Sequence, residues 1–192
     1  TGMVSEILRL TTPERTRLAH LTPEIVNGRG PVFASVGAES TAQAIIYARE
    51  AENAGNDALM AIPPTLTGLP EQAQLDYFSA LAEATNLPLI IQDASAYVGQ
   101  AIPLEVLVKL LEKFGPDKIL FKPEAAPLGP NLSALRDATD GQAKIFEGSG
   151  GILLIDSFRR GITGTMPGMD LLDGIIEVWR ALQAGEDKRA YE

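Results

Sequence analysis

Lys122 ends a short apolar run that begins at Ile119, and Pro123 and Glu124 follow it directly. The run predicts a buried strand, and the proline removes a ladder hydrogen bond just beyond it. A lysine at the end of a buried strand has to be solvated, paired or functional, because burying an isolated charge is costly. A desolvated lysine can lose its proton and attack a ketone, forming a Schiff base. The alternative is a lysine at the rim whose ammonium reaches water.

Glu124 and a glycine-rich turn are polar groups that could share a site with this lysine. Glu124 follows Lys122 by two positions, so in an unbroken strand both side chains point to the same side. Glu124 then holds the lysine or binds the hydroxyl groups of a sugar acid, and the alternative is a solvated acid at the rim. Gly148, Ser149 and Gly150 offer N–H groups and a hydroxyl that suit an anionic group. The same triplet before a helix is also typical of an N-cap turn.

Asp93 and Tyr97 follow another strongly apolar run, residues 87–92. Asp93 either orients a water molecule or binds a substrate hydroxyl, or it starts the loop as an Asx turn. Tyr97 either brings its phenol to the cleft as an acid–base group or packs at the rim. In a barrel of alternating strands and helices, the carboxyl ends of the strands face the active site.

The composition restricts the class of protein. The 192 residues are 45% hydrophobic and 21% charged, as in a globular chain with one core. A net charge of -9 argues against non-specific nucleic-acid binding. The chain has no long apolar window, no signal-peptide pattern and no cysteine, so we expect no membrane segment and a cytoplasmic location. His20 is the one histidine and makes no metal site alone, so no metal is expected.

Apolar runs alternate regularly with helix signals along the chain. Six strands are predicted, at 31–36, 58–62, 87–92, 119–122, 144–147 and 161–166. Seven helices are predicted, at about 12–27, 41–54, 70–85, 103–114, 131–139, 152–160 and 170–184. The strands are short and apolar, which is typical of a parallel sheet buried on both faces.

This alternation predicts an α/β fold, either a (β/α)8 TIM barrel or an open doubly wound sheet. A doubly wound sheet favours a G-x-G-x-x-G turn after its first strand, and the sequence has none. A complete barrel needs about 200 to 250 residues. We therefore expect residues 1–192 to form one incomplete (β/α)8-type catalytic domain, truncated at both ends and lacking the first strand.

Several motifs resemble those of the dihydrodipicolinate synthase and N-acetylneuraminate lyase family, which consists of Schiff-base barrels. The matching segments follow the family's order and spacing, at 2–6, 36–41, 63–64, 121–124, 147–150 and 161–168. The resemblance implies that Lys122 is the Schiff-base nucleophile and that Met166 and the turn at 148–150 lie at the substrate site. It also implies a 2-oxo acid as the bound molecule, no cofactor, and a homo-oligomer, either a dimer or a tetramer.

The chain departs from the family's pattern at positions that bind substrate or transfer protons. The family's carboxylate-binding Thr-Thr pair aligns with Met3 and Val4, which carry no hydroxyl. Its acid–base tyrosine aligns with Thr65, and a threonine hydroxyl is a poor acid at neutral pH. The arginine that reads the second substrate in dihydrodipicolinate synthase aligns with Tyr97, so Tyr97 is a candidate replacement for the missing phenol.

Two functions follow from these residues. The first is a lyase, an aldolase or hydro-lyase, that acts through Lys122 on a 2-oxo acid such as pyruvate or a keto-deoxy sugar acid. The departures disfavour dihydrodipicolinate synthase itself. The second is a catalytically depleted barrel of the same family that binds a metabolite or serves structurally.

Overall fold

A computed structural model describes Gly2 and residues 6–192, and its strands are parallel and sequential. The strands are β1 (Phe33–Ser35), β2 (Ala58–Ala61), β3 (Leu89–Asp93), β4 (Ile119–Pro123), β5 (Phe146–Glu147) and β6 (Gly164–Thr165). Strands β1 to β4 form one sheet in that order, and β5 pairs with β6. A bridge between Phe121 and Ile145 joins the two sheets. This order never reverses, so the sheet is wound as a barrel and not as a doubly wound sheet.

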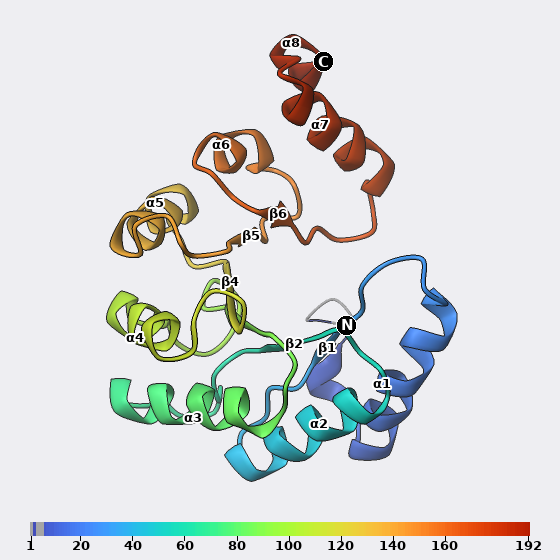
Figure 1. The fold of residues 1–192 in the computed structure, drawn as a ribbon, viewed down its shortest axis with the longest axis vertical. Coiled ribbons are helices and arrows are strands. Elements are labelled where there is room, and N and C mark those ends of the chain that lie inside the picture. Colours follow the sequence, from blue (N-terminus) through green and yellow to red (C-terminus); the bar gives the residue numbers. More distant parts are fainter. Residues whose placement is uncertain (1, 3–5) are drawn as a thin grey trace.

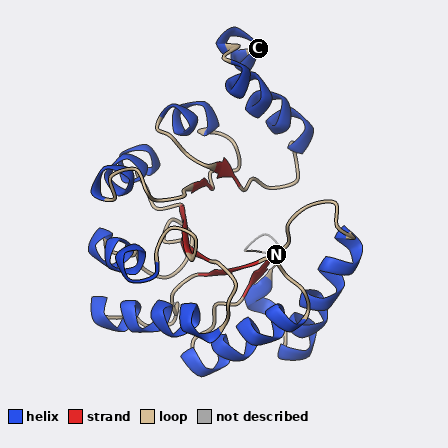
Figure 2. Ribbon diagram, in the orientation of Figure 1, coloured by secondary structure: helices blue, strands red, loops and turns tan. Residues whose placement is uncertain are grey.

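The helices lie along the outside of an arc of strands (Figures 1 and 2). They are α1 (Thr12–Val26), α2 (Thr41–Asn53), α3 (Glu71–Ala84), α4 (Leu104–Phe114), α5 (Leu128–Ala138), α6 (Leu154–Arg159), α7 (Leu172–Ala184) and α8 (Asp187–Tyr191). A 3-10 turn, η2 (Ile7–Arg9), precedes them. The six predicted strands and seven predicted helices are all confirmed, with shifted ends. No helix in the described part of the chain is long and apolar enough to cross a membrane.

Two helix boundaries show how local chemistry sets the elements. Thr11 and Glu14 form a capping box at the start of α1: the backbone N–H and hydroxyl of Thr11 donate to the Glu14 carboxylate at 2.8 and 2.7 Å. Helix α5 begins at Leu128, three residues before the predicted start. Pro130 is accommodated there because the first turn of a helix has no intrahelical use for its N–H groups.

Helix α8 was not predicted. It has only five residues, and its sequence is mostly charged, so it carries no apolar periodicity. Its buried residue Ala190 packs in a cluster with α6 and α7. Arg159 of α6 also reaches α8, donating to Asp187 at 3.1 Å and to the Tyr191 hydroxyl at 3.0 Å. Tertiary contacts therefore stabilise a helix that is too short to be recognised in isolation.

The strands have two buried faces with different neighbours. Residues of the outer face pack against the helices and include Ala34, Leu59, Leu89, Ile91, Ile119 and Phe121. Residues of the inner face form a separate cluster of strand side chains: Phe33, Ala58, Met60, Ile90, Leu120 and Met166. Because side chains alternate along a strand, the residue two positions after Leu120 also belongs to the inner face. That residue is Lys122.

Candidate active site

Lys122 lies at the carboxyl end of β4, on the inner face of the strands. Its side chain is only 10% exposed. The ammonium Nζ donates a hydrogen bond to Oε1 of Glu124, the one hydrogen-bonding partner that it has among the described residues. The lysine is therefore buried and paired with an acid, and it is not the solvated rim residue that the sequence left open. A lysine in this position can serve as a nucleophile once its proton has a place to go.

Glu124 is buried as well, with a side chain 5% exposed. Its Oε1 accepts from Lys122, and its Oε2 accepts from Nε2 of Gln92 at 2.9 Å. The backbone N–H of Glu124 donates to the carbonyl of Asp93 at 2.8 Å, so its main chain is tied to β3. The prediction that Glu124 holds the lysine is confirmed as a contact, and the alternative of a solvated rim acid is wrong.

Gln92 is a site residue that the sequence reasoning missed. It lies on β3 directly beside Lys122, its partner in the strand register, and is 2% exposed. The signal was present, because Gln92 is the one polar side chain in the run 87–92 and shares the inner face with Ile90. Counting alternate positions places Gln92 on the same face as Ile90, and the strand register then sets it beside the lysine.

Gly148 packs against the side chain of Glu124. A Cβ atom at Gly148 would lie 2.4 Å from Oε1, 2.5 Å from Cγ and 2.8 Å from Cδ of Glu124. These distances are too short for any side chain, so the loop after β5 packs its bare backbone against the carboxylate. Of the predicted turn, Gly148 is thus the residue that the structure brings to Lys122 and Glu124.

Ser149 and Gly150 have local roles in the same loop. The Ser149 hydroxyl accepts from the N–H of Leu153 at 2.9 Å, in the turn ahead of α6. The N-cap residue of α6 is Leu153, so Ser149 orders this turn without being the N-cap of the helix. Gly150 has a φ of 74°, a left-handed conformation that glycine adopts without strain. The structure shows this turn geometry, while a role in binding an anionic group stays a prediction.

Glu147 is a second buried carboxylate that the sequence reasoning passed over. It is fully buried, and its Oε1 accepts from the N–H of Ser149 at 2.5 Å. Its Oε2 accepts from the Thr165 hydroxyl at 2.8 Å, and its carbonyl accepts from the N–H of Met166 at 2.9 Å. Glu147 therefore ties the loop of Gly148 to β6.

Asp93 has both carboxylate oxygens in use. Oδ1 accepts from the N–H of Ser95 at 3.0 Å, and Oδ2 accepts from the N–H of Ile102 at 2.9 Å. The first contact is the predicted Asx turn, and the second closes the loop between β3 and α4. Asp93 is 6% exposed, so it fixes the loop that carries Tyr97.

Tyr97 extends from this loop and is 64% exposed. The pKa of its phenol is raised, first by partial burial and then by the negative charges of Glu124 and Glu147. The phenol therefore interacts electrostatically with both carboxylates and stays protonated at neutral pH. Its exposure places it at the rim, and a role as an acid–base group stays a prediction.

Thr65 joins two loops at the same end of the sheet. Its hydroxyl and N–H donate to Oε1 of Glu39 at 2.7 and 2.8 Å, and the N–H of Leu66 donates to Oε2 at 3.1 Å. Burial alone would raise the pKa of Glu39, but these three hydrogen bonds outweigh it and the pKa is lowered. A Cβ atom at Gly99 would lie 3.5 Å from Cγ2 of Thr65, so Thr65 also borders the loop of Tyr97.

The remaining predicted residues are Met166, Met3 and Val4. Met166 packs on the inner face, in the cluster that contains Met60 and Leu120. Met3 and Val4 lie outside the described residues. Within Gly2 and 6–192, no group of three or more His, Cys, Asp or Glu side chains is arranged to hold a metal ion.

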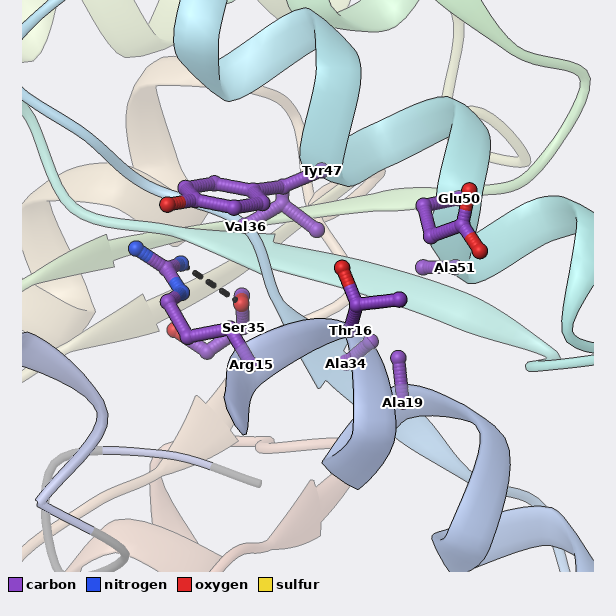
Figure 3. A pocket seen from close by; sticks show the side chains of 9 residues that line it. All are labelled: Arg15, Thr16, Ala19, Ala34, Ser35, Val36, Tyr47, Glu50 and Ala51. Carbon is purple, nitrogen blue, oxygen red and sulfur yellow. Dashed lines mark hydrogen bonds between the residues drawn. The ribbon is translucent and has the colours of Figure 1, made fainter. Parts of the chain in front are cut away.

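A small cavity lies elsewhere, in the layer between α1, α2 and β1 (Figure 3). Its volume is about 10 Å³, room for one water molecule at most. The buried guanidinium of Arg15 donates to the carbonyls of Ser35 and Gly37 at 3.0 Å and lies 3.8 Å from the ring centre of Tyr47. These contacts hold α1 and α2 on β1, so this cavity belongs to the packing of the barrel wall.

The fold and the site define a parallel barrel with a buried lysine and carboxylate at the carboxyl end of β4. The Dihydrodipicolinate synthetase family model matches residues 1–170, and the chain belongs to that family. The similarity to individual relatives is lower. The 4-hydroxy-tetrahydrodipicolinate synthase of Methanopyrus kandleri is 31% identical over 113 residues, which are 59% of this chain and 38% of the relative. The Rhizobium meliloti enzyme of the same name is 28% identical over 138 residues, 72% of this chain and 42% of the relative.

Solved structures agree over nearly the whole chain. The 4-hydroxy-tetrahydrodipicolinate synthase of Methylacidiphilum fumariolicum SolV has a TM-score of 0.90 at 27% identity, covering 100% of this chain and 63% of its own. The chloride-inhibited dihydrodipicolinate synthase of Acinetobacter baumannii, complexed with pyruvate, has a TM-score of 0.89 at 25% identity, covering 99% and 65%. The prediction of a TIM barrel and of a divergent family member is confirmed. The chain spans less than two thirds of these relatives.

Proposed function

We propose that this protein is a lyase that forms a Schiff base between Lys122 and a 2-oxo acid. The observation that carries the proposal is the place of Lys122: it is buried on the inner face, at the strand end where barrel enzymes have their active sites. Pyruvate or a keto-deoxy sugar acid is the proposed substrate, and the pyruvate complex of the Acinetobacter baumannii relative supports testing pyruvate first. On this proposal, residues 1–192 belong to one catalytic domain.

The chemistry needs an amine, a carbonyl and proton transfer. The free amine of Lys122 attacks the keto carbon, and loss of water leaves a protonated imine. The imine withdraws electrons from the neighbouring carbon, so a C–C bond can break in an aldolase or a hydroxyl can leave in a hydro-lyase. This sequence of steps uses no metal and no organic cofactor. A cytoplasmic homo-oligomer, a dimer or tetramer, remains a proposal from the family resemblance.

A second candidate is a catalytically depleted barrel that binds a metabolite or serves structurally. The observation in its favour is that two predicted site residues already use their polar side-chain atoms in hydrogen bonds within the protein. The Thr65 hydroxyl donates a hydrogen bond to Glu39, and both carboxylate oxygens of Asp93 accept from backbone N–H groups. Neither group is free to take over proton transfer from the family's tyrosine.

Borohydride trapping separates the two functions. The full natural chain is incubated with pyruvate, and then with other 2-oxo acids, in the presence of borohydride. We expect a stable mass increase in the parent and none in Lys122→Arg, because a guanidinium keeps its proton near neutral pH. If the parent traps no 2-oxo acid, the lyase proposal is wrong and the binding or structural barrel takes its place.

A further inference from the structure

Schiff-base formation needs a group that moves protons beside Lys122. The amine has to give up a proton before it attacks, and the oxygen of the substrate has to gain protons before it leaves as water. A threonine hydroxyl is a poor acid, and the Thr65 hydroxyl already donates a hydrogen bond to Glu39. Tyr97 keeps its proton and is largely exposed. Among the described residues, Glu124 is the one titratable group in hydrogen-bonding contact with Nζ of Lys122.

We propose that Glu124 is the catalytic acid–base group of this site, positioned by Gln92 and Gly148. The inference rests on the proposed function of Lys122. The surroundings of Glu124 leave its two oxygens with different tasks. Oε2 is held by the Gln92 amide at 2.9 Å, and Oε1 faces the lysine. The bare backbone of Gly148 lies against Oε1, Cγ and Cδ and prevents the side chain from turning away on that side.

The proton movements balance within this pair. The carboxylate of Glu124 takes a proton from the Lys122 ammonium, and the free amine forms a C–N bond to the keto carbon. The proton on that nitrogen passes to the former carbonyl oxygen, giving a carbinolamine. Glu124 then donates its proton to the hydroxyl, the C–O bond breaks, and water leaves as the nitrogen lone pair forms the C=N bond. The products are a protonated imine, water and the restored carboxylate.

The same carboxylate can serve the lyase step. In an aldol cleavage, it accepts the proton of the substrate hydroxyl whose carbon becomes a carbonyl. The electrons of the breaking C–C bond pass into the imine and leave an enamine. Glu124 then performs the proton transfers for which the family uses a tyrosine. Because Glu124 follows Lys122 by two residues, directly after β4, the site does not need the hydroxyl of Thr65, which donates to Glu39.

Rates of adduct formation test the role of Glu124. Glutamine has nearly the same shape as glutamate but cannot accept the proton. We expect Glu124→Gln to slow trapping of the pyruvate adduct by about 100-fold or more. Glu124→Asp keeps the carboxylate at a shorter reach, so we expect a smaller loss. The matched control is Glu83→Gln, which removes the carboxylate of an exposed Lys113–Glu83 pair (2.8 Å) and should leave the rate unchanged.

The positioning role of Gln92 has its own readout. Gln92→Leu keeps the size of the side chain but removes the donor that stabilises the Glu124 carboxylate. We expect the acidic limb of the pH–rate profile for trapping to move to higher pH. A residue that only fills space would leave that limb in place. The other titratable groups that interact with Glu124 are Lys122, through its hydrogen bond, and Tyr97, through its electrostatic interaction, and both are unchanged in this variant.

The outcomes separate this inference from the proposed function. A parent that traps pyruvate, together with a Glu124→Gln variant that traps it equally fast, overturns the role of Glu124 and leaves Lys122 as the nucleophile. A parent that traps no 2-oxo acid overturns both proposals. If Glu124→Gln does not fold, the test uses Glu124→Asp and Gln92→Leu instead. The inference is contradicted if both variants trap pyruvate at the parental rate and with an unchanged pH–rate profile.

Discussion

Replacing Gly148 with alanine should destabilise the protein through one side chain, that of Glu124. The new Cβ would lie 2.4 to 2.8 Å from Oε1, Cγ and Cδ of Glu124, and no other atom is among its three nearest contacts. Glu124 cannot move freely, because Lys122 and Gln92 hold its two oxygens. Overpacking of this kind costs about 1–3 kcal/mol of the free energy of unfolding.

A double-mutant cycle isolates the contact. Glu124→Ala removes all three of the atoms that the new Cβ would meet, so Gly148→Ala should cost nothing in that background. It can even stabilise by up to about 1 kcal/mol, because alanine restricts the unfolded chain and Gly148 does not have a positive φ. We therefore expect a coupling free energy of about 1–3 kcal/mol between the two substitutions, measured by urea unfolding of the parent, both single variants and the double variant.

Gly150→Ala is the matched control in the same loop. No atom lies within 4 Å of its ideal Cβ, and its φ of 74° imposes a strain of about 1–2 kcal/mol that does not involve Glu124. Its cost should be the same in the parent and in Glu124→Ala. An equal cost of Gly148→Ala in both backgrounds would refute the packing of Gly148 against Glu124.

Three further substitutions test the surrounding framework. Arg15→Met loses two hydrogen bonds from a charged donor, so we expect a loss of about 3 kcal/mol or more in denaturant unfolding, with no comparable loss in the exposed Arg17→Met. Burial raises the pKa of Tyr77 to about 12, against about 10 in an unfolded chain, so the parent should lose stability as the pH rises from about 10 to 12. Tyr77→Phe should lack that decline, and an identical decline would contradict the assignment. Thr65→Val removes a hydrogen bond that lowers the pKa of Glu39, so its loss of melting temperature should be present at pH 7 and should fade as the pH falls below about 4.5.

The order and type of the elements were predictable from the sequence because the barrel repeats one simple unit. Apolar strands, glycine stops and N-caps recur at regular spacing along the chain. The boundaries were less predictable where local signals are ambiguous. The start of α5 was predicted three residues too late, although the first turn of a helix accepts a proline such as Pro130.

Only some of the contacts in the site could be predicted from the sequence, because the others join residues that are distant along the chain. Lys122 is in β4 and Glu124 directly follows it, so their contact agrees with side-chain alternation carried one residue past the strand. Gln92 and Gly148 reach Glu124 from other strands and loops, and only the strand register and the packing of the loop after β5 bring them there. The Asx turn of Asp93 was among its predicted roles, but its contact with the N–H of Ile102 depends on how the loop closes. Thr65 bonds to Glu39, 26 residues earlier in the sequence, and only the fold brings the two together.

Mapping the borohydride-trapped adduct to a single lysine tests the central claim most directly. Lys118 is an internal comparison, because burial lowers the pKa of its amine. Its ammonium donates to the carbonyls of Thr85 and Leu87 at 2.6 Å, just before β4 begins, at the end of the strand opposite Lys122. We predict that peptide mass spectrometry finds the reduced 2-oxo acid on Lys122 and not on Lys118. An adduct on Lys118, or one spread over the exposed lysines, would contradict the assignment of Lys122 as the nucleophile.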